Sequence, residues 1–117
     1  MPPHRLLFVE DEPAIARAVI RLLKRDGYEV DLAGSHAESL IYSDAYDCGV
    51  FDISLPDSDG VELADRLRSR GVVKHVVFFS GVDDADVERR ARQTGIFVHK
   101  TEGVSRLRAA IASLLSA

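Results

Sequence analysis

Short apolar runs alternate along this chain with longer segments of helical period. Five runs have the length of buried strands, and they span residues 5–9, 28–32, 48–52, 74–79 and 96–98. Runs that are apolar on both faces are typical of parallel strands covered by helices on both sides. The pattern therefore predicts a sheet of five parallel strands.

The first two helices are predicted from spacing and end signals. Pro13 suits a first helical turn, where its missing N–H costs nothing, and Gly27 suits the C-terminal end. The apolar positions between them are Ile15, Val19, Leu22 and Leu23. Ser35 and Glu38 have capping-box spacing, so we expect the second helix from Ser35 to about Asp44.

Three more helices are expected in the second half of the chain. A loop rich in turn formers spans residues 55–60, and the third helix follows from Val61 to Gly71. Acidic residues 83, 84 and 86 favour the start of a fourth helix, although only Val87 and Ala91 give it an apolar stripe. The fifth helix runs to the end of the chain, with apolar positions at Val104, Leu107, Ile111 and Leu114.

Together these segments form five consecutive strand–helix units. Right-handed crossovers between parallel strands then give a doubly wound α/β fold, (βα)5, whose five-stranded parallel sheet carries helices on both faces. We expect residues 1–117 to form a single domain, because no linker or repeat interrupts the pattern.

Composition narrows the class of protein. The chain has 15 basic and 19 acidic residues and a net charge of −4, which argues against direct binding of nucleic acid. No apolar stretch approaches the roughly 20 residues of a membrane helix, and no secretory leader is visible. Cys48 is the one cysteine and cannot form an internal disulfide, which fits a cytoplasmic protein.

Polar side chains follow four of the predicted strands at the point where each strand ends. They are Glu10 and Asp11, Asp52, Ser80, and Lys100. The carboxyl ends of parallel strands lie on one edge of a sheet, where ligands bind. We therefore expect three acids, one hydroxyl and one amine to converge.

The acids suit Mg²⁺, which prefers oxygen ligands. Glu10, Asp11 and Asp52 would be ligands, with the backbone carbonyl of Ser54 as a further one. Three adjacent carboxylates would repel one another without a cation. The alternative is that Glu10 and Asp11 cap the helix at Pro13 and that Asp52 caps a loop.

A carboxylate can also attack a phosphoryl group, and Asp52 is the candidate nucleophile. Ser80 and Lys100 would then hold the phosphoryl oxygens, and Gly81 leaves room for their approach. The alternatives are that Asp52 is only a metal ligand, that Ser80 caps the next helix and that Lys100 is solvated.

The remaining motifs do not indicate a further binding or catalytic site. Neither glycine-rich nucleotide motif is present, and the four histidines show no metal-ligand spacing. Arg89, Arg90 and Arg92 form either a solvated face or a docking face for an acidic partner.

Four short motifs, taken in their order and spacing, resemble those of a known protein family over nearly the full chain. They are Val9-Glu10-Asp11-Glu12, residues 52–60 (DISLPDSDG), Phe79-Ser80-Gly81 and Phe97-Val98-His99-Lys100. The chain resembles the receiver domain of two-component response regulators, which has the CheY-like (flavodoxin-like) fold. The resemblance implies that Asp52 accepts a phosphoryl group from a histidine kinase or phosphotransfer protein, with Mg²⁺ at Glu10 and Asp11.

The resemblance also implies how the signal leaves the site. Ser80 would be the switch hydroxyl, Lys100 would pair with the phosphoryl group, and Phe97 would be the aromatic that rotates. The fourth helix, fifth strand and fifth helix would form the face for a protein partner, with a phosphorylation-linked homodimer as one form of output. Such a domain catalyses only its own phosphorylation and dephosphorylation.

Three features depart from the family pattern. Thr101 follows Lys100 where the family usually has a cis proline, and the stretch between Ser80 and Lys100 is slightly short. Ser54 and Val82 occupy the positions that tune access of the hydrolytic water. Because Val82 offers that water no hydrogen bond, we expect a long-lived phosphoryl group.

Two other interpretations of the sequence stay open. A haloacid-dehalogenase-type phosphatase also uses an aspartate nucleophile, Mg²⁺, a hydroxyl and a lysine, but it needs a second acid where Ser54 stands. A pseudo-receiver would be an interaction module that is never phosphorylated. The intact acids, Ser80 and Lys100 argue against it, and Thr101 keeps it open.

Overall fold

A parallel sheet forms the centre of the molecule in the computed structural model, which describes residues 3–39, 45–55 and 58–116. Its strands are β1 (Arg5–Val9), β2 (Glu29–Ala33), β3 (Tyr46–Phe51), β6 (Val73–Ser80) and β7 (Ile96–His99). They lie in the order β2-β1-β3-β6-β7, and every neighbouring pair is parallel. The predicted five-stranded parallel sheet is confirmed.

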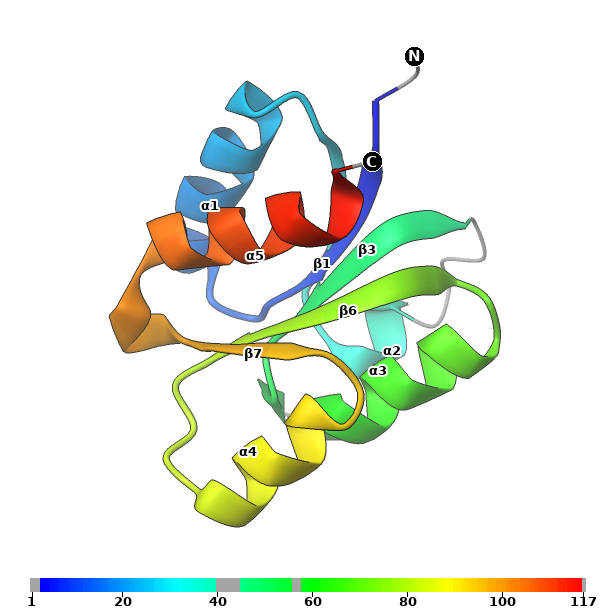
Figure 1. Cartoon of the computed structure of the whole chain (residues 1–117), viewed down its shortest axis with the longest axis vertical. Coiled ribbons are helices and arrows are strands. Elements are labelled where there is room, and N and C mark those ends of the chain that lie inside the picture. Colours follow the sequence, from blue (N-terminus) through cyan, green and yellow to red (C-terminus); the bar gives the residue numbers. More distant parts are fainter. Residues whose placement is uncertain (1–2, 40–44, 56–57, 117) are drawn as a thin grey trace.

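Helices cover both faces of the sheet (Figure 1). On one face lie α1 (Pro13–Arg25) and α5 (Val104–Leu115), and the other face carries α2 (His36–Ser39), α3 (Gly60–Ser69) and α4 (Ala85–Arg92). A single turn of 3₁₀ helix, η1 (Lys100–Glu102), connects β7 to α5. The doubly wound arrangement expected from the sequence is therefore present.

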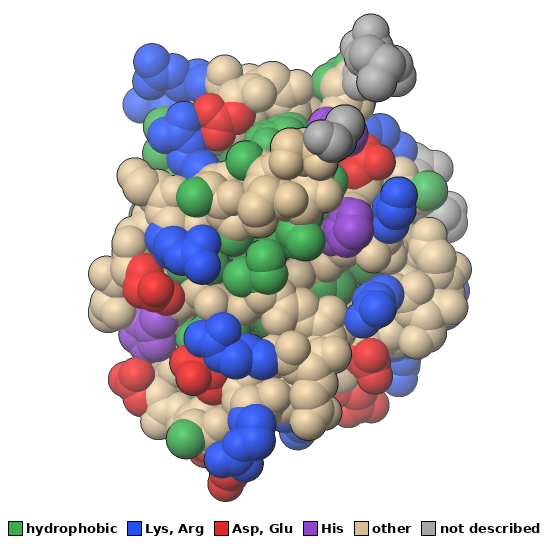
Figure 2. All heavy atoms as spheres, in the orientation of Figure 1, with side chains coloured by type: hydrophobic (Ala, Val, Ile, Leu, Met, Phe, Trp, Pro, Cys, Tyr) green, Lys and Arg blue, Asp and Glu red, His purple; other side chains and the backbone are tan. Residues whose placement is uncertain are grey.

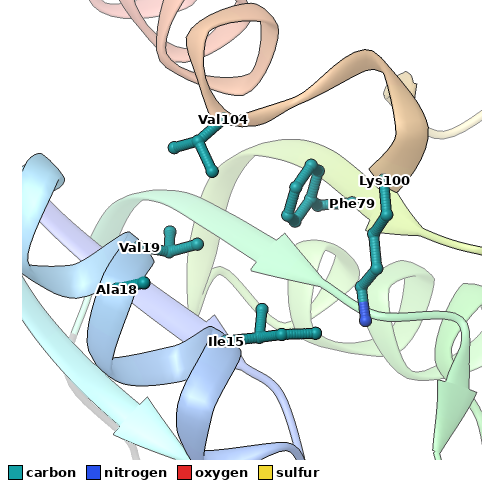
Figure 3. Close-up of a pocket in the computed structure, with 6 residues that line it drawn as sticks. All are labelled: Ile15, Ala18, Val19, Phe79, Lys100 and Val104. Atoms are coloured by element: carbon teal, nitrogen blue, oxygen red, sulfur yellow. The ribbon is translucent and has the colours of Figure 1, made fainter.

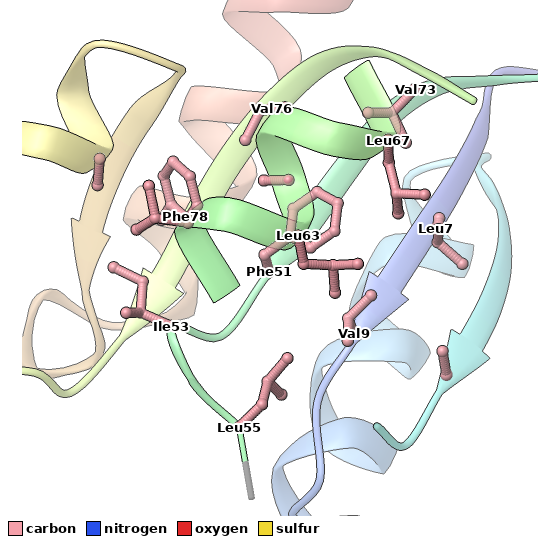
Figure 4. Packing of buried hydrophobic residues seen from close by; sticks show 14 of the residues in the cluster. Leu7, Val9, Phe51, Ile53, Leu55, Leu63, Leu67, Val73, Val76 and Phe78 are labelled. Atoms are coloured by element: carbon pink, nitrogen blue, oxygen red, sulfur yellow. The ribbon is translucent and has the colours of Figure 1, made fainter. Parts of the chain in front are cut away.

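The core has two layers because successive strand residues point to opposite faces. On the α3 side, Phe51 and Phe78 pack with Leu63 and Leu67 of α3 (Figure 4). On the α1 and α5 side, the layer includes Leu6, Phe8, Val50, Val77 and Leu107. A one-residue slip would exchange these layers, so core packing fixes where each strand ends.

Cys48 lies in the second layer and is fully buried, as its strand position predicted. Burial raises the pKa of its thiol to about 12, so the side chain behaves as a small apolar residue.

Element boundaries differ slightly from the predicted ones. β2 begins and ends one residue later than expected, and α3 begins at Gly60. In the predicted loop, β4 (Ser54–Leu55) pairs antiparallel with β5 (Ser58–Asp59). The Glu38 N–H donates to Ser35 Oγ (3.1 Å), as the capping pattern predicted, while residues 40–44 lie outside the described residues.

Helix α4 forms as predicted despite its weak apolar stripe, with Ala91 as its one buried residue. The Asp84 carboxylate caps the helix by accepting hydrogen bonds from the N–H groups of Asp86 (2.9 Å) and Val87 (3.2 Å). Ion pairs Arg89–Asp86 and Arg92–Glu88 add weak support along its exposed side. Capping and charge therefore support a helix that buries little apolar surface.

Among the described residues, no helix combines the length and apolar character needed to cross a bilayer.

Candidate functional site

The three predicted acids meet at the carboxyl edge of the sheet. One carboxylate oxygen from each of Glu10, Asp11 and Asp52 lies within 4.8 Å of the others. The backbone extends the strand pairing here, because the Asp52 N–H donates to the Val9 carbonyl (3.0 Å) and the Glu10 N–H donates to the Ala33 carbonyl (3.0 Å). The sheet itself therefore positions Glu10 and Asp52, with Asp11 next in the chain, and the predicted convergence of the three acids is confirmed.

Each oxygen of Asp52 has its own donor. The Ser80 hydroxyl donates to Oδ1 (2.9 Å), and the Lys100 ammonium donates to Oδ2 (3.1 Å). Asp52 is only 4% exposed and Ser80 is fully buried. The predicted hydroxyl and amine thus reach the same carboxylate, where their hydrogen bonds are charge-assisted.

Lys100 also pairs with Glu10, with 3.0 Å between Nζ and Oε1. Burial raises the pKa of Glu10 to about 7, and the Asp52 charge adds to the rise, although Lys100 opposes it. Burial acts to lower the pKa of Lys100, but its bonds to Glu10 and Asp52 outweigh burial and raise that pKa. The lysine is therefore held as a cation between two carboxylates.

The site can accept a further cation. Glu10 is 1% exposed, and among the described residues the one polar partner of its Oε1 is the Lys100 ammonium at 3.0 Å. Three carboxylates face one ammonium group, so negative charge remains in excess. A buried carboxylate oxygen with spare acceptor capacity suits a divalent cation that prefers oxygen ligands.

Ser54 lies at the rim of the site. Its N–H donates to Asp52 Oδ1 (3.2 Å), and Ser54 lines a pocket of about 290 Å³ with Asp11, Gly81 and Lys100. The role of its backbone carbonyl as a metal ligand stays a prediction.

Helix capping does not account for these side chains. The N-cap residue of α1 is Glu12, which makes no side-chain capping bond, and Glu10 Oε2 accepts only a long bond from the Glu12 N–H (3.4 Å). Ser80 Oγ accepts from the Val82 N–H (3.4 Å), but the cap of α4 is Asp84. Helix capping therefore does not explain Glu10 and Ser80, whereas Asp52 does cap its loop, because Oδ1 accepts from the Ser54 N–H (3.2 Å).

The stem of Lys100 runs along an apolar pocket. It lines an apolar pocket of about 210 Å³ with Ile15, Phe79 and Val104, and its amino group lies at the far end of the extended stem (Figure 3). No cis peptide bond occurs in the part of the chain that the structure describes. The lysine therefore reaches both carboxylates with Thr101 in place of the family's proline.

Phe97 is buried, with 3% of its surface exposed. Its ring lies 5.7 Å from the Arg92 guanidinium and 6.4 Å from the His99 ring. The ring thus occupies an inward position, and its predicted rotation is untested.

Gly60 shapes the site in a way that sequence reasoning did not predict. A Cβ at this position would lie 2.2 Å from the Asp52 carbonyl oxygen, and the Gly60 N–H donates to the Ile53 carbonyl (2.9 Å). Only glycine allows α3 to begin this close to the segment that carries Asp52. In the sequence, Gly60 was one of several turn formers.

The three arginines of α4 are exposed and paired with acids. Arg89 and Arg92 pair within the helix, and Arg90 pairs with Asp59 at the start of α3. This favours the solvated-face interpretation. The Arg90–Asp59 pair also joins α4 to the segment after Asp52.

Comparison with known proteins agrees with this geometry. The family model "Response regulator receiver domain" matches residues 6–112. The transcriptional regulatory protein DltR of Streptococcus agalactiae is 40% identical over 78 residues, covering 65% of this chain and 35% of that protein. A putative transcriptional regulator of Pseudomonas aeruginosa is 33% identical over 118 residues, covering 96% and 56%. The chain thus spans about a third to just over half the length of these two relatives.

Solved structures give the same result. The response regulator TrrA of Thermotoga maritima, in complex with Mg²⁺-BeF, is 26% identical with a TM-score of 0.84, covering 96% of this chain and 99% of that one. A putative response regulator of Chloroflexus aurantiacus is 27% identical with a TM-score of 0.84, covering 98% and 99%. The chain belongs to the response regulator receiver domain family and is a receiver domain of two-component signalling.

Proposed function

We propose that Asp52 is the phosphoryl acceptor of this receiver domain. The observation that carries the proposal is the pair of donors on its carboxylate, Ser80 at 2.9 Å and Lys100 at 3.1 Å, beside Glu10 and Asp11. The donor would be a phosphohistidine on a histidine kinase or phosphotransfer protein. An Asp52 oxygen attacks phosphorus, the P–N bond breaks, and the histidine nitrogen keeps the electron pair and is reprotonated.

We further propose that the cofactor is Mg²⁺, held by Glu10, Asp11, Asp52 and the Ser54 carbonyl. When bound it would neutralise charge on the phosphoryl oxygens. The excess of carboxylates over ammonium groups at this edge supports the assignment.

Ser80 and Lys100 would hold the transferred group. Their hydroxyl and ammonium now occupy the two Asp52 oxygens, so each lies within a short movement of a phosphoryl oxygen bound there. Stabilising charge on transferring oxygens is the main catalytic task in phosphoryl transfer, because such sites act mostly by positioning.

The output surface is proposed to be the face formed by α4, β7 and α5, with a protein as partner. Acidic and basic side chains are interspersed over this face (Figure 2), which suits a polar, reversible contact. A phosphorylation-linked homodimer through this face is an alternative form of the same output. With a net charge of −4, residues 1–117 are not proposed to contact nucleic acid themselves.

The phosphoryl group is proposed to be long-lived, because half-buried Val82 offers no hydrogen bond to a hydrolytic water. Loss of the phosphoryl group within seconds in Mg²⁺ would contradict this part of the proposal.

The test is incubation with Mg²⁺ and a small phosphodonor such as phosphoramidate, followed by intact mass. We expect one phosphoryl adduct on the wild type, none on Asp52→Asn and none with a chelator present. Asp65→Asn, which removes an exposed acid of α3, is the matched control and should keep the adduct. A wild type that stays unmodified would favour a pseudo-receiver, and steady turnover of a phosphate ester would favour a phosphatase.

A further inference from the structure

His99, at the end of β7, lies between the two loops that border the site. One loop (residues 81–84) follows Ser80, and the other begins with Lys100. His99 is the register partner of Ser80 in the β6–β7 pair, and its Nε2 lies 2.9 Å from Asp83 Oδ1. The His99 side chain thus connects the loop of residues 81–84, here called the Ser80 loop, to the turn that begins with Lys100, here called the Lys100 turn.

The contacts of the ring assign its tautomer. Nδ1 accepts from the Thr101 N–H (3.1 Å) and lies 2.7 Å from the Thr101 hydroxyl. Since Nδ1 acts as an acceptor, the ring proton is on Nε2, which donates to Asp83. The Glu102 carboxylate in turn accepts from the His99 N–H (2.7 Å), which completes a capping box around η1.

Two structural consequences follow. The Thr101 N–H, which a proline would lack, is used to close the turn that presents Lys100. The hydrogen bond from His99 to Asp83 ties the Ser80 loop to the end of β7. In the same structure, Ser80 and Lys100 both reach Asp52. The Asp83 carboxylate is 88% exposed, and the His99 ring is its polar contact among the described residues.

We propose that His99 is a positioning residue that couples Ser80 and Lys100 through Asp83, so that both donors meet a phosphoryl group on Asp52 together. The inference rests on the proposed function of Asp52. It differs from a purely local role for His99, in which the ring would only cap η1 through Thr101.

Two substitutions separate these roles. His99→Asn keeps an acceptor near the Nδ1 position for the Thr101 N–H but cannot reach Asp83. His99→Gln keeps a donor near the Nε2 position for Asp83 but loses the capping acceptor. Coupling through Asp83 predicts that the Asn variant is impaired and that the Gln variant is largely rescued, while a local cap predicts the reverse.

The readout is binding of beryllium fluoride, a phosphoryl mimic, followed by ¹⁹F NMR at saturating Mg²⁺. We expect His99→Asn and Asp83→Ala each to weaken beryllium fluoride binding by about two- to fivefold, the size expected for one solvent-exposed hydrogen bond. The double variant should bind beryllium fluoride no more weakly than either single variant does. Mg²⁺ affinity and the midpoint of thermal unfolding should stay close to wild type, because Asp83 and the Nε2 atom contact no metal-site acid.

Asp65→Ala is the matched control, since it removes one exposed acid of α3 without touching either loop, and it should bind like the wild type. Wild-type binding in both His99→Asn and Asp83→Ala would overturn the coupling and leave the role of Asp52 intact. No binding by the wild type itself would contradict the proposed function together with this inference.

Discussion

At the residue scale, the chemistry of Asp52 depends on two neighbours that are distant in sequence. Ser80 ends β6 and Lys100 directly follows β7, and each holds a different oxygen of the carboxylate. The sequence predicted these residues because each follows an apolar strand. It could not predict the second contact of Lys100, with Glu10, because that contact depends on how the lysine stem packs.

Replacing Ser80 with alanine tests the hydroxyl donor. We expect Ser80→Ala to accept a phosphoryl group from phosphoramidate on the order of 100-fold more slowly, because one donor to the developing charge is lost. The rate is measured by intact mass over time. Ser113→Ala, whose hydroxyl bonds only within α5, should keep the wild-type rate. An unchanged rate in Ser80→Ala would contradict the assigned role.

At the element scale, the start of α3 sets the position of the Asp52 segment. Gly60 opens this helix against the backbone of Asp52 and Ile53, and Arg90 of α4 pairs with Asp59 next to it. The strands and most helices could be predicted from apolar spacing. The close approach at Gly60 and the short β4–β5 pairing could not, because they arise from tertiary contacts.

A methyl group at Gly60 should therefore disturb both stability and the site. We expect Gly60→Ala to lower the free energy of unfolding in urea by about 1–3 kcal/mol, as overpacking does, and to weaken Mg²⁺ binding. Gly81→Ala is the control for stability, because a Cβ there meets nothing within 4 Å. Equal unfolding midpoints for the two variants would show that the Asp52 segment can move aside.

Helix α4 should depend measurably on its N-terminal cap. We expect Asp84→Ala to cost about 1 kcal/mol, since two helical N–H groups lose their acceptor. Hydrogen exchange should show the loss as faster exchange within α4. Asp65→Ala, on the exposed side of α3, should leave exchange in α4 unchanged. The sequence favoured this helix through its acidic start, although only Val87 and Ala91 gave it an apolar stripe.

At the scale of the whole molecule, an ion pair joins the first and last helices. Arg108 of α5 donates to both oxygens of Asp26 at the end of α1, at 2.8 and 2.5 Å. The Arg108 guanidinium lowers the pKa of Asp26 below its ordinary value. Neither residue stood out in the sequence, because they are 82 positions apart.

This pair predicts how stability changes in acid. A lowered folded-state pKa contributes stability above the ordinary aspartate pKa, and that stability is lost as the pH falls through the folded-state pKa. Asp26→Asn should therefore be less stable than wild type in urea at pH 7, with a difference that narrows in acid below about pH 4. Arg108→Gln should reproduce this behaviour. A stability difference between Asp26→Asn and the wild type that stays constant down to pH 3 would contradict this role of the ion pair.

The central claim is that Asp52 itself carries the phosphoryl group. Borohydride reduction converts an aspartyl phosphate to homoserine, so peptide mapping after phosphorylation in Mg²⁺ and reduction identifies the modified residue directly. We predict homoserine at position 52 and at no other aspartate. Homoserine at Asp11 or at another aspartate would contradict the account. So would the absence of homoserine from a protein whose intact mass shows a phosphoryl group.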